Sequence, residues 1–214
     1  VVSLLSRRYH DRVAHCVYRK QRRIVLCVNR GETAPLVPPP APRSAAHRLW
    51  PCAAQQASRW KQAIEQLNQT VALNSVDIST MDAIVIPGGH GVMFDLADSL
   101  AATKVIETFN QQNKIIAAIC HGPAALVNAK GIDGKPLVAG KDMTAFSDSE
   151  EQAVQLVNDM PFLLESKLKE LGAKVTTTSN FKPYATQSGN LITGQNPASS
   201  HAAAELVIKA LKQK

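Results

Sequence analysis

Short apolar runs alternate with amphipathic stretches along the second two thirds of the chain. Residues 83–86 and 114–119 are almost entirely apolar over the length of a strand, and residues 99–112 between them carry apolar side chains at helical spacing. Strands that are apolar on both faces and separated by helices are typical of a parallel sheet covered by helices on both sides. The pattern therefore predicts an α/β fold built on a doubly wound parallel sheet.

The same alternation continues toward the C-terminus. Ser149, which acidic residues follow, is predicted to open a helix, and Gly172 is predicted to end another helix whose apolar face carries Leu164, Leu168 and Leu171. The other predicted elements are a helix at 60–67 capped by Ser58, a strand near 70–73, a helix at 122–129, strands at 143–146, 175–178 and 191–193, and a terminal helix opened by Ser199 and Ser200.

The first 57 residues do not follow this pattern. One apolar run at 24–28 is typical of a strand, but the stretch after it contains Pro38-Pro39-Pro40 and lacks helical periodicity. We therefore divide the chain into an irregular, Arg/Pro-rich segment, residues 1–57, and an α/β domain, residues 58–214. A chain of 214 residues with 45% hydrophobic content suits one such core rather than two.

The charge of the chain divides at nearly the same place. The net charge of +7 comes from the first 60 residues, which hold eleven of the 24 Lys+Arg residues against only Asp11 and Glu32. The remainder is slightly acidic and offers no basic surface for phosphates, which argues against nucleic acid as a partner. No apolar run approaches the roughly 20 residues of a membrane span, and four cysteines without paired spacing do not indicate a disulfide framework. We expect a cytoplasmic protein that binds neither nucleic acid nor membranes.

The basic residues also change type abruptly. All ten arginines lie between Arg7 and Arg59, whereas every lysine except Lys20 lies at or beyond Lys61. We take this as a sign that residues 1–57 are a translation in a different reading frame or another foreign start. A transit peptide is the weaker interpretation, since such peptides are amphipathic and serine-rich.

Cys120 is the main candidate for a reactive residue. It follows the apolar run 115–119 and precedes Gly122-Pro123, so it is predicted to lie at the carboxyl end of a strand, where open parallel sheets collect their reactive groups. A strand-turn-helix elbow exposes a nucleophile, and a helix N-terminus there would lower the thiol pKa below about 8.5. His121 can reach the sulfur only if the backbone bends sharply. For an isolated Cys-His pair, a small buried residue beside a helix cap is the simpler interpretation.

A glycine-rich turn follows the neighbouring strand. Gly88, Gly89 and Gly91 let the backbone approach a ligand closely, and the backbone N–H groups of Gly89 and His121 are predicted to form an oxyanion hole. Taken alone, such a turn is a weak signal. His90 within it is interpreted as a loop residue rather than a ligand.

Five segments in a fixed order add a resemblance to this picture. They are IPGGHG at 86–91, AAICHGPAAL at 117–126, FSDSEE at 146–151, PFLLE at 161–165 and LITGQNPASS at 191–200. In sequence, order and spacing they resemble the ThiJ/PfpI superfamily, and within it the glutathione-independent glyoxalase III branch.

The resemblance implies a flavodoxin-like fold and a catalytic group made of Cys120, His121 and Glu151. Glu151 would orient the imidazole, as the acid does in other triads. Without the resemblance, a carboxylate at this position is explained by the helix N-terminus, and that is the role we expect for Glu150.

The resemblance also implies a substrate and the groups that contact it. A small 2-oxoaldehyde such as methylglyoxal would form a hemithioacetal with Cys120 and leave as a 2-hydroxy acid, without glutathione, metal or another cofactor. Gly88, Gly89 and His121 would supply the oxyanion hole, and Asn196 would line the substrate site. Relatives are commonly dimers, so a homodimer is expected.

The early part of the chain departs from the family pattern, and several alternative functions stay open. Superfamily members begin with a strand, a helix carrying a glutamate that hydrogen-bonds the nucleophilic sulfur, and a second strand, and we expect residues 1–57 to lack a regular strand-helix-strand of this kind. The glutamate has no counterpart either, because Glu32 precedes the proline run. The alternative functions are repair of glycated protein, amidase or peptidase activity, a holding chaperone for unfolded proteins, and a redox sensor. An inactive family member is the remaining alternative.

Overall fold

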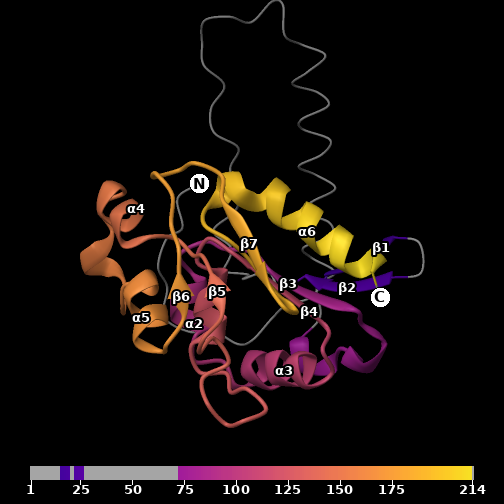
Figure 1. Ribbon diagram of the computed structural model, residues 1–214. Coiled ribbons are helices and arrows are strands. Elements are labelled where there is room, and N and C mark those ends of the chain that lie inside the picture. Colours follow the sequence, from indigo (N-terminus) through magenta and orange to yellow (C-terminus); the bar gives the residue numbers. More distant parts are fainter. Residues whose placement is uncertain (1–14, 20–21, 27–71, 214) are drawn as a thin grey trace, which may run out of the picture.

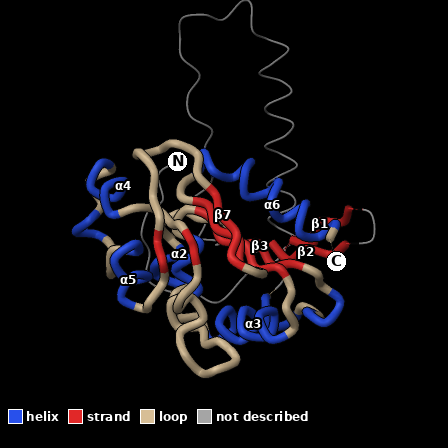
Figure 2. Tube along the Cα trace, in the orientation of Figure 1, coloured by secondary structure: helices blue, strands red, loops and turns tan. Residues whose placement is uncertain are grey.

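The computed structural model describes residues 15–19, 22–26 and 72–213. Its main sheet has six strands in the order β1-β2-β3-β4-β8-β7 (Figures 1 and 2). Strands β2, β3, β4 and β8 are parallel to their neighbours among these four, and the two outer strands, β1 and β7, pair antiparallel. The bounds are β1 His15–Arg19, β2 Arg22–Leu26, β3 Ala83–Ile86, β4 Ile115–Ile119, β7 Ala185–Ser188 and β8 Leu191–Gly194.

Helices cover both faces of this sheet. The five α-helices of the described residues are α2 Val92–Asp95, α3 Leu100–Gln111, α4 Asp148–Ala153, α5 Leu164–Glu170 and α6 Ser200–Lys212. Short 3₁₀ turns occupy Leu73–Ser75, Ile78–Thr80, Gly122–Leu126, Val157–Asp159 and Pro197–Ser199. A second sheet of two short strands, β5 Asp142–Met143 and β6 Lys174–Val175, lies beside α5 (Figure 1).

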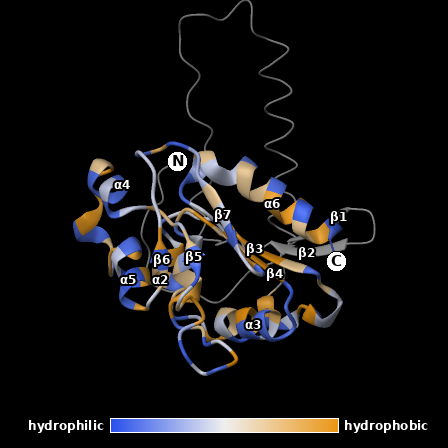
Figure 3. Ribbon diagram, viewed as in Figure 1, coloured by the Kyte–Doolittle hydropathy of each residue, from blue (hydrophilic) through white to orange (hydrophobic). Residues whose placement is uncertain are grey.

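The alternation of side chains along β4 explains why two helix layers form. Successive residues of a strand point to opposite faces, so Ile116 and Ala118 join the core on the α3 side while Ile115, Ala117 and Ile119 join the core on the α6 side. The two helices lie on opposite sides of the sheet in Figure 3, and Phe109 of α3 and Val207 of α6 belong to the two cores. The doubly wound parallel α/β sheet predicted from the apolar runs is confirmed.

Several predicted elements are confirmed, together with residues that mark where they begin or end. Strands β3, β4 and β8 fall where the apolar runs lie. Helix α3 begins after Ser99, whose Oγ accepts a hydrogen bond from the Ala102 N–H. Helix α5 ends before Gly172, whose φ of 87° is the left-handed conformation that favours glycine at this position.

Other predictions were wrong in detail. The segment predicted as a helix at 122–129 is a five-residue 3₁₀ turn, Gly122–Leu126, in which every residue is buried. The predicted strand at 143–146 shortens to β5. The helix predicted after Ser149 begins after Ser147, because Ser147 and Glu150 form a reciprocal capping box. The polar edge strand β7 has no apolar run and was missed.

The early chain is described only in part. The run predicted as a strand at 24–28 overlaps β2, which pairs with β3 in parallel. The predicted helix at 60–67 lies outside the described residues, as do residues 70–71 and most of residues 1–57. The strand predicted near 70–73 was wrong in its described half, since Leu73 begins the 3₁₀ turn Leu73–Ser75. No helix of the described part is long and apolar enough to cross a membrane.

Candidate active site

Cys120 lies at a sharp bend directly after β4. Its φ of 61° is in the left-handed region, which is uncommon for a residue with a side chain. The bend is held by a hydrogen bond from the Cys120 N–H to the Gly194 carbonyl (2.8 Å) and by one from the Phe146 N–H to the Cys120 carbonyl (3.0 Å). Strain of this kind persists only where surrounding contacts hold it. The strand-turn elbow predicted from the sequence is therefore present, and a 3₁₀ turn takes the place of the expected helix.

Two glycines allow the neighbouring strand ends to meet at the bend. A Cβ atom built on Gly88 would lie 2.5 Å from the Cys120 Cβ, and one on Gly122 would lie 2.2 Å from the Ile86 carbonyl oxygen. Neither spacing can accommodate a side chain. The loop after β3 and the turn after β4 are thus in direct contact because both positions are glycine.

The bend brings His121 back to the sulfur of its own neighbour. The His121 Nδ1 lies 3.3 Å from the Cys120 Sγ, and the His121 Nε2 lies 2.8 Å from the Glu151 Oε2. The His121 side chain is completely buried. Cys120, His121 and Glu151 form a continuous line from nucleophile to base to carboxylate, which is the arrangement of a catalytic triad.

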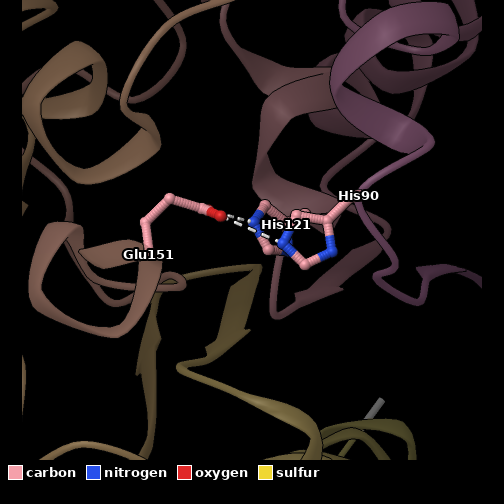
Figure 4. Close-up of side chains that lie close together, drawn as sticks. All are labelled: His90, His121 and Glu151. Atoms are coloured by element: carbon pink, nitrogen blue, oxygen red, sulfur yellow. Dashed lines mark hydrogen bonds and ion pairs between the residues drawn. The ribbon is translucent and has the colours of Figure 1, made fainter. Parts of the chain in front are cut away.

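A fourth residue joins this line. The His90 Nε2 lies 3.0 Å from the Glu151 Oε1, so one carboxylate binds two imidazoles whose ring centroids are 4.1 Å apart (Figure 4). The sequence analysis interpreted His90 as a loop residue, and it does lie in the turn after β3, but its contact with Glu151 was not predicted. A histidine inside a glycine-rich turn next to a candidate nucleophile was the only signal, and its partner lies 61 positions away.

The protonation states of the two catalytic partners follow from their surroundings. Burial lowers the pKa of His121, partly opposed by the hydrogen bond to Glu151, so the imidazole is neutral near pH 7. Burial works against ionisation of Glu151, but the hydrogen bond and charge of His121 outweigh it and lower the pKa of the carboxyl. An ionised Glu151 must accept the Nε2–H of His121. The lone pair of His121 Nδ1 then faces the Cys120 thiol.

The pKa of the Cys120 thiol differs from the expectation. Burial raises the pKa of Cys120 to about 11, although hydrogen bonds from the backbone N–H groups of Gly89 and His121 act in the opposite direction. The side chain is only 6% exposed, so loss of hydration outweighs the local dipoles. The prediction that the elbow holds Cys120 as a thiolate is therefore wrong for the unliganded site. The His121 Nδ1, at 3.3 Å, is the nearby group that can accept the proton of this thiol.

The backbone N–H groups predicted as an oxyanion hole lie beside the sulfur. Those of Gly89 and His121 both hydrogen-bond Cys120, and Gly88 provides the close approach described above. Gly89 has a φ of 110°, a conformation that few other residues adopt.

Glu150 and Asn196 connect the segments around the site through hydrogen bonds. Glu150 is fully buried, and its Oε1 accepts hydrogen bonds from the Phe181 N–H (2.7 Å) and the Asn196 Nδ2 (2.8 Å). The same amide of Asn196 donates to the Lys182 carbonyl, and its Oδ1 accepts from Ser199. These contacts join α4, the 180–184 loop and the segment before α6. Direct contact of Asn196 with a substrate stays a prediction.

Aromatic rings form one side of the site, and the sequence analysis did not single them out. The Phe146 ring lies 4.4 Å from the His121 ring and 5.9 Å from the His90 ring, between centroids. Phe181, about half exposed, lies 6.4 Å from Phe146. Phe146 is buried and covers one side of the His121 imidazole.

Comparison with known proteins gives a consistent set of relatives. The model of the DJ-1/PfpI family matches residues 55–210. The probable glutathione-independent glyoxalase hsp3104 of Schizosaccharomyces pombe is 32% identical over 157 residues, which cover 71% of this chain and 69% of that protein.

Solved structures agree with this assignment. Rapid Encystment Protein 24 kDa of Francisella tularensis is 37% identical with a TM-score of 0.64, covering 66% of this chain and 63% of the other. Glyoxalase III of Candida albicans is 27% identical with a TM-score of 0.61, covering 64% and 60%. The chain thus spans between 60 and 69% of the length of these three relatives.

Proposed function

The chain belongs to the DJ-1/PfpI family, and we propose that it is a glutathione-independent glyoxalase that uses Cys120 as its nucleophile. The observation that carries the proposal is the line from the Cys120 sulfur through both nitrogens of His121 to the Glu151 carboxylate. Relatives named as glutathione-independent glyoxalase and glyoxalase III support the choice of reaction. The substrate class is a small 2-oxoaldehyde such as methylglyoxal.

The reaction begins with addition of the thiol to the aldehyde carbon. The Cys120 proton moves to His121 Nδ1 while the sulfur–carbon bond forms, and the aldehyde oxygen takes up the negative charge. The N–H groups of Gly89 and His121 are the donors available to that oxygen. Return of the proton from His121 to the oxygen gives a neutral hemithioacetal.

His121 then moves a proton between the two carbons. The neutral imidazole removes the proton from the carbon that bears sulfur and passes it to the adjacent ketone oxygen, which gives an enediol. His121 then takes the hydroxyl proton of the first carbon and delivers it to the second carbon, so the first carbon becomes a thioester carbonyl. The first carbon is oxidised and the second is reduced within one molecule, so this step needs no external oxidant or reductant.

Hydrolysis completes the cycle. Water adds to the thioester carbonyl, and the Cys120 sulfur leaves and regains its proton from His121. The product is a 2-hydroxy acid. Glu151 stays ionised throughout and stabilises the imidazolium that His121 becomes each time it holds a proton.

The restricted access to the sulfur favours a small substrate over a protein one. Cys120 is almost completely buried, and a three-carbon aldehyde reaches such an atom more readily than a glycated side chain of a folded protein. Repair of glycated proteins therefore ranks below glyoxalase activity, and a holding chaperone activity stays the alternative from another class. A homodimer and a cytoplasmic location remain predictions, and light scattering after size exclusion tests the first.

The test is conversion of methylglyoxal to lactate by the purified chain in the absence of glutathione. We expect turnover by the unmodified chain and loss of turnover in Cys120→Ala. Circular dichroism and thermal melting of both proteins verify that the variant is folded. Equal turnover by a folded Cys120→Ala variant contradicts the role of the sulfur. Suppression of client aggregation without any turnover favours the chaperone alternative.

A further inference from the structure

We propose that His90, His121 and Glu151 form an inhibitory binding site for Zn²⁺, which switches off the Cys120–His121 pair without contacting the sulfur. The ion site stands on geometry alone, whereas its effect on turnover rests on the proposed function. No step of the proposed reaction needs a metal. The site would make the enzyme sensitive to free zinc.

The three side chains already point at a common volume. One ligand atom from each lies within 4.8 Å of the other two. The Glu151 Oε1 lies 3.0 Å from the His90 Nε2, and its Oε2 lies 2.8 Å from the His121 Nε2 (Figure 4). Ligands of a tetrahedral zinc lie about 2.0–2.2 Å from the ion, and hence roughly 3.3 Å from each other. Side-chain shifts on the order of 1 Å are enough to reach that spacing.

The donor set and its charge favour zinc. Two imidazole nitrogens and one carboxylate oxygen are the ligands of many zinc sites that leave a fourth position open. Glu151 supplies a negative charge in a buried environment, where it is weakly screened. The His90 side chain is 28% exposed while the other two are almost fully buried, so an ion enters from the His90 side.

Zinc at this position changes which nitrogen of His121 carries the proton. In the free protein the Nε2–H donates to Glu151 and the Nδ1 lone pair faces the sulfur. Zinc takes the Nε2 lone pair, and the single proton of the neutral ring moves through solvent to Nδ1, with no net proton released. Nδ1 lies 3.3 Å from the Cys120 Sγ. With a proton already there, His121 cannot accept the one from the thiol.

Inhibition by this route differs from direct ligation of the sulfur. The sulfur lies beside Nδ1, while the ion is held at Nε2, on the other edge of the same ring. Zinc is therefore expected to slow all reactions that need the thiolate, including alkylation by iodoacetamide. Removal of the sulfur should leave zinc binding intact.

Four proteins test the site by calorimetric titration with Zn²⁺: the unmodified chain, Cys120→Ala, His90→Gln and His201→Gln. Gln at position 90 retains an N–H donor for Glu151 but lacks the imidazole. His201 is highly exposed and pairs with Glu205 on α6, so it serves as the matched control. We expect unchanged affinity in Cys120→Ala and His201→Gln and a loss of about 10-fold or more in His90→Gln. Zinc that binds elsewhere on the chain contributes to the titration of all four proteins, so the difference between them reports this site.

The rate of Cys120 alkylation, read by peptide mass spectrometry, gives a second measurement that does not depend on glyoxalase activity. Zinc should slow alkylation in the unmodified chain and in His201→Gln, and much less in His90→Gln. Glu151→Gln, which removes a different ligand, replaces His90→Gln if that variant does not fold.

Two outcomes overturn the proposal. One is loss of zinc binding in Cys120→Ala, which makes the sulfur a ligand. The other is unchanged zinc affinity in His90→Gln. Failure of methylglyoxal turnover without zinc contradicts the proposed function and leaves both zinc measurements valid.

Discussion

Glu150 and Glu151 are adjacent in the sequence, yet their carboxylates belong to separate hydrogen-bond networks. Glu151 binds the imidazoles of His90 and His121, and Glu150 binds backbone and amide groups of the surrounding loops. Consecutive helical residues point roughly 100° apart, which directs the two side chains to different neighbours. The Glu151 carboxylate contacts the two imidazoles, and the Glu150 carboxylate joins the surrounding loops.

Glu151→Gln should lower kcat for methylglyoxal by about 10²- to 10⁴-fold. The amide cannot balance the positive charge that His121 acquires when it takes the Cys120 proton. Lactate production under saturating substrate measures the effect. A Glu151→Gln variant with unaltered kcat would show that the carboxylate is not part of the catalytic line.

Glu150→Gln should lower the free energy of unfolding by about 1–3 kcal/mol. The carboxylate accepts hydrogen bonds from the N–H and Oγ of Ser147 as well as from Phe181 and Asn196. A glutamine amide has an NH₂ group in place of one carboxylate oxygen, so some of these donors would face another donor and lose their hydrogen bond. Urea unfolding measures the change. Glu170→Gln, at an exposed ion pair with Lys167, is the control and should change stability by less than about 1 kcal/mol. Equal effects of the two substitutions contradict this assignment.

Gly88→Ala should destabilise the protein by about 1–3 kcal/mol and impair turnover, because the new methyl group overlaps the elbow. Its Cβ would lie 2.5 Å from the Cys120 Cβ and 2.8 Å from the Ile119 carbonyl oxygen. Urea unfolding and the lactate assay are the measurements. Gly134→Ala is the control. Gly134 has a φ of 77° but open space around it, so this substitution introduces backbone strain without a steric overlap. Full activity in Gly88→Ala is incompatible with the close contact.

Alkylation of Cys120 in the free protein should increase with pH up to about 11, the value to which burial raises the thiol pKa. An exposed cysteine levels off near pH 9, because its thiol is then largely ionised. Peptide mass spectrometry after timed exposure to iodoacetamide separates Cys120 from the other cysteines. A plateau below pH 8 would falsify the neutral-thiol description of the resting site.

The same thiol should make stability depend on alkaline pH. Between pH 9 and about 11 the folded protein keeps a proton that the unfolded chain has released, so this stabilising contribution is complete below pH 9 and is lost as pH rises to about 11. The difference in stability between the unmodified chain and Cys120→Ala should therefore shift by about 2–3 kcal/mol across that window. Urea unfolding at several pH values tests this. Parallel pH profiles of the two proteins contradict the raised pKa.

Some features of the site could be predicted because they depend on neighbouring residues. The apolar run ending at Cys120, followed by Gly122, indicated a strand end and a turn without knowledge of the rest of the fold. The role of Glu151 came from a resemblance in order and spacing. Ser147 was missed as the helix cap because Ser149 has acidic residues behind it too, and only the contact with Glu150 distinguishes the two serines.

Local sequence thus determined the parallel sheet, the elbow after β4 and the adjacent positions of Cys120 and His121 at that elbow, since apolar periodicity and glycine conformation act over a few residues. Tertiary structure alone decided that His90 shares a carboxylate with His121 and that the Cys120 thiol is protonated. Both depend on groups that are distant along the chain and on how much water the surrounding side chains exclude. Hydration and long-range electrostatics depend on how the folded chain arranges its groups in space, and a short pattern of residues does not predict that arrangement.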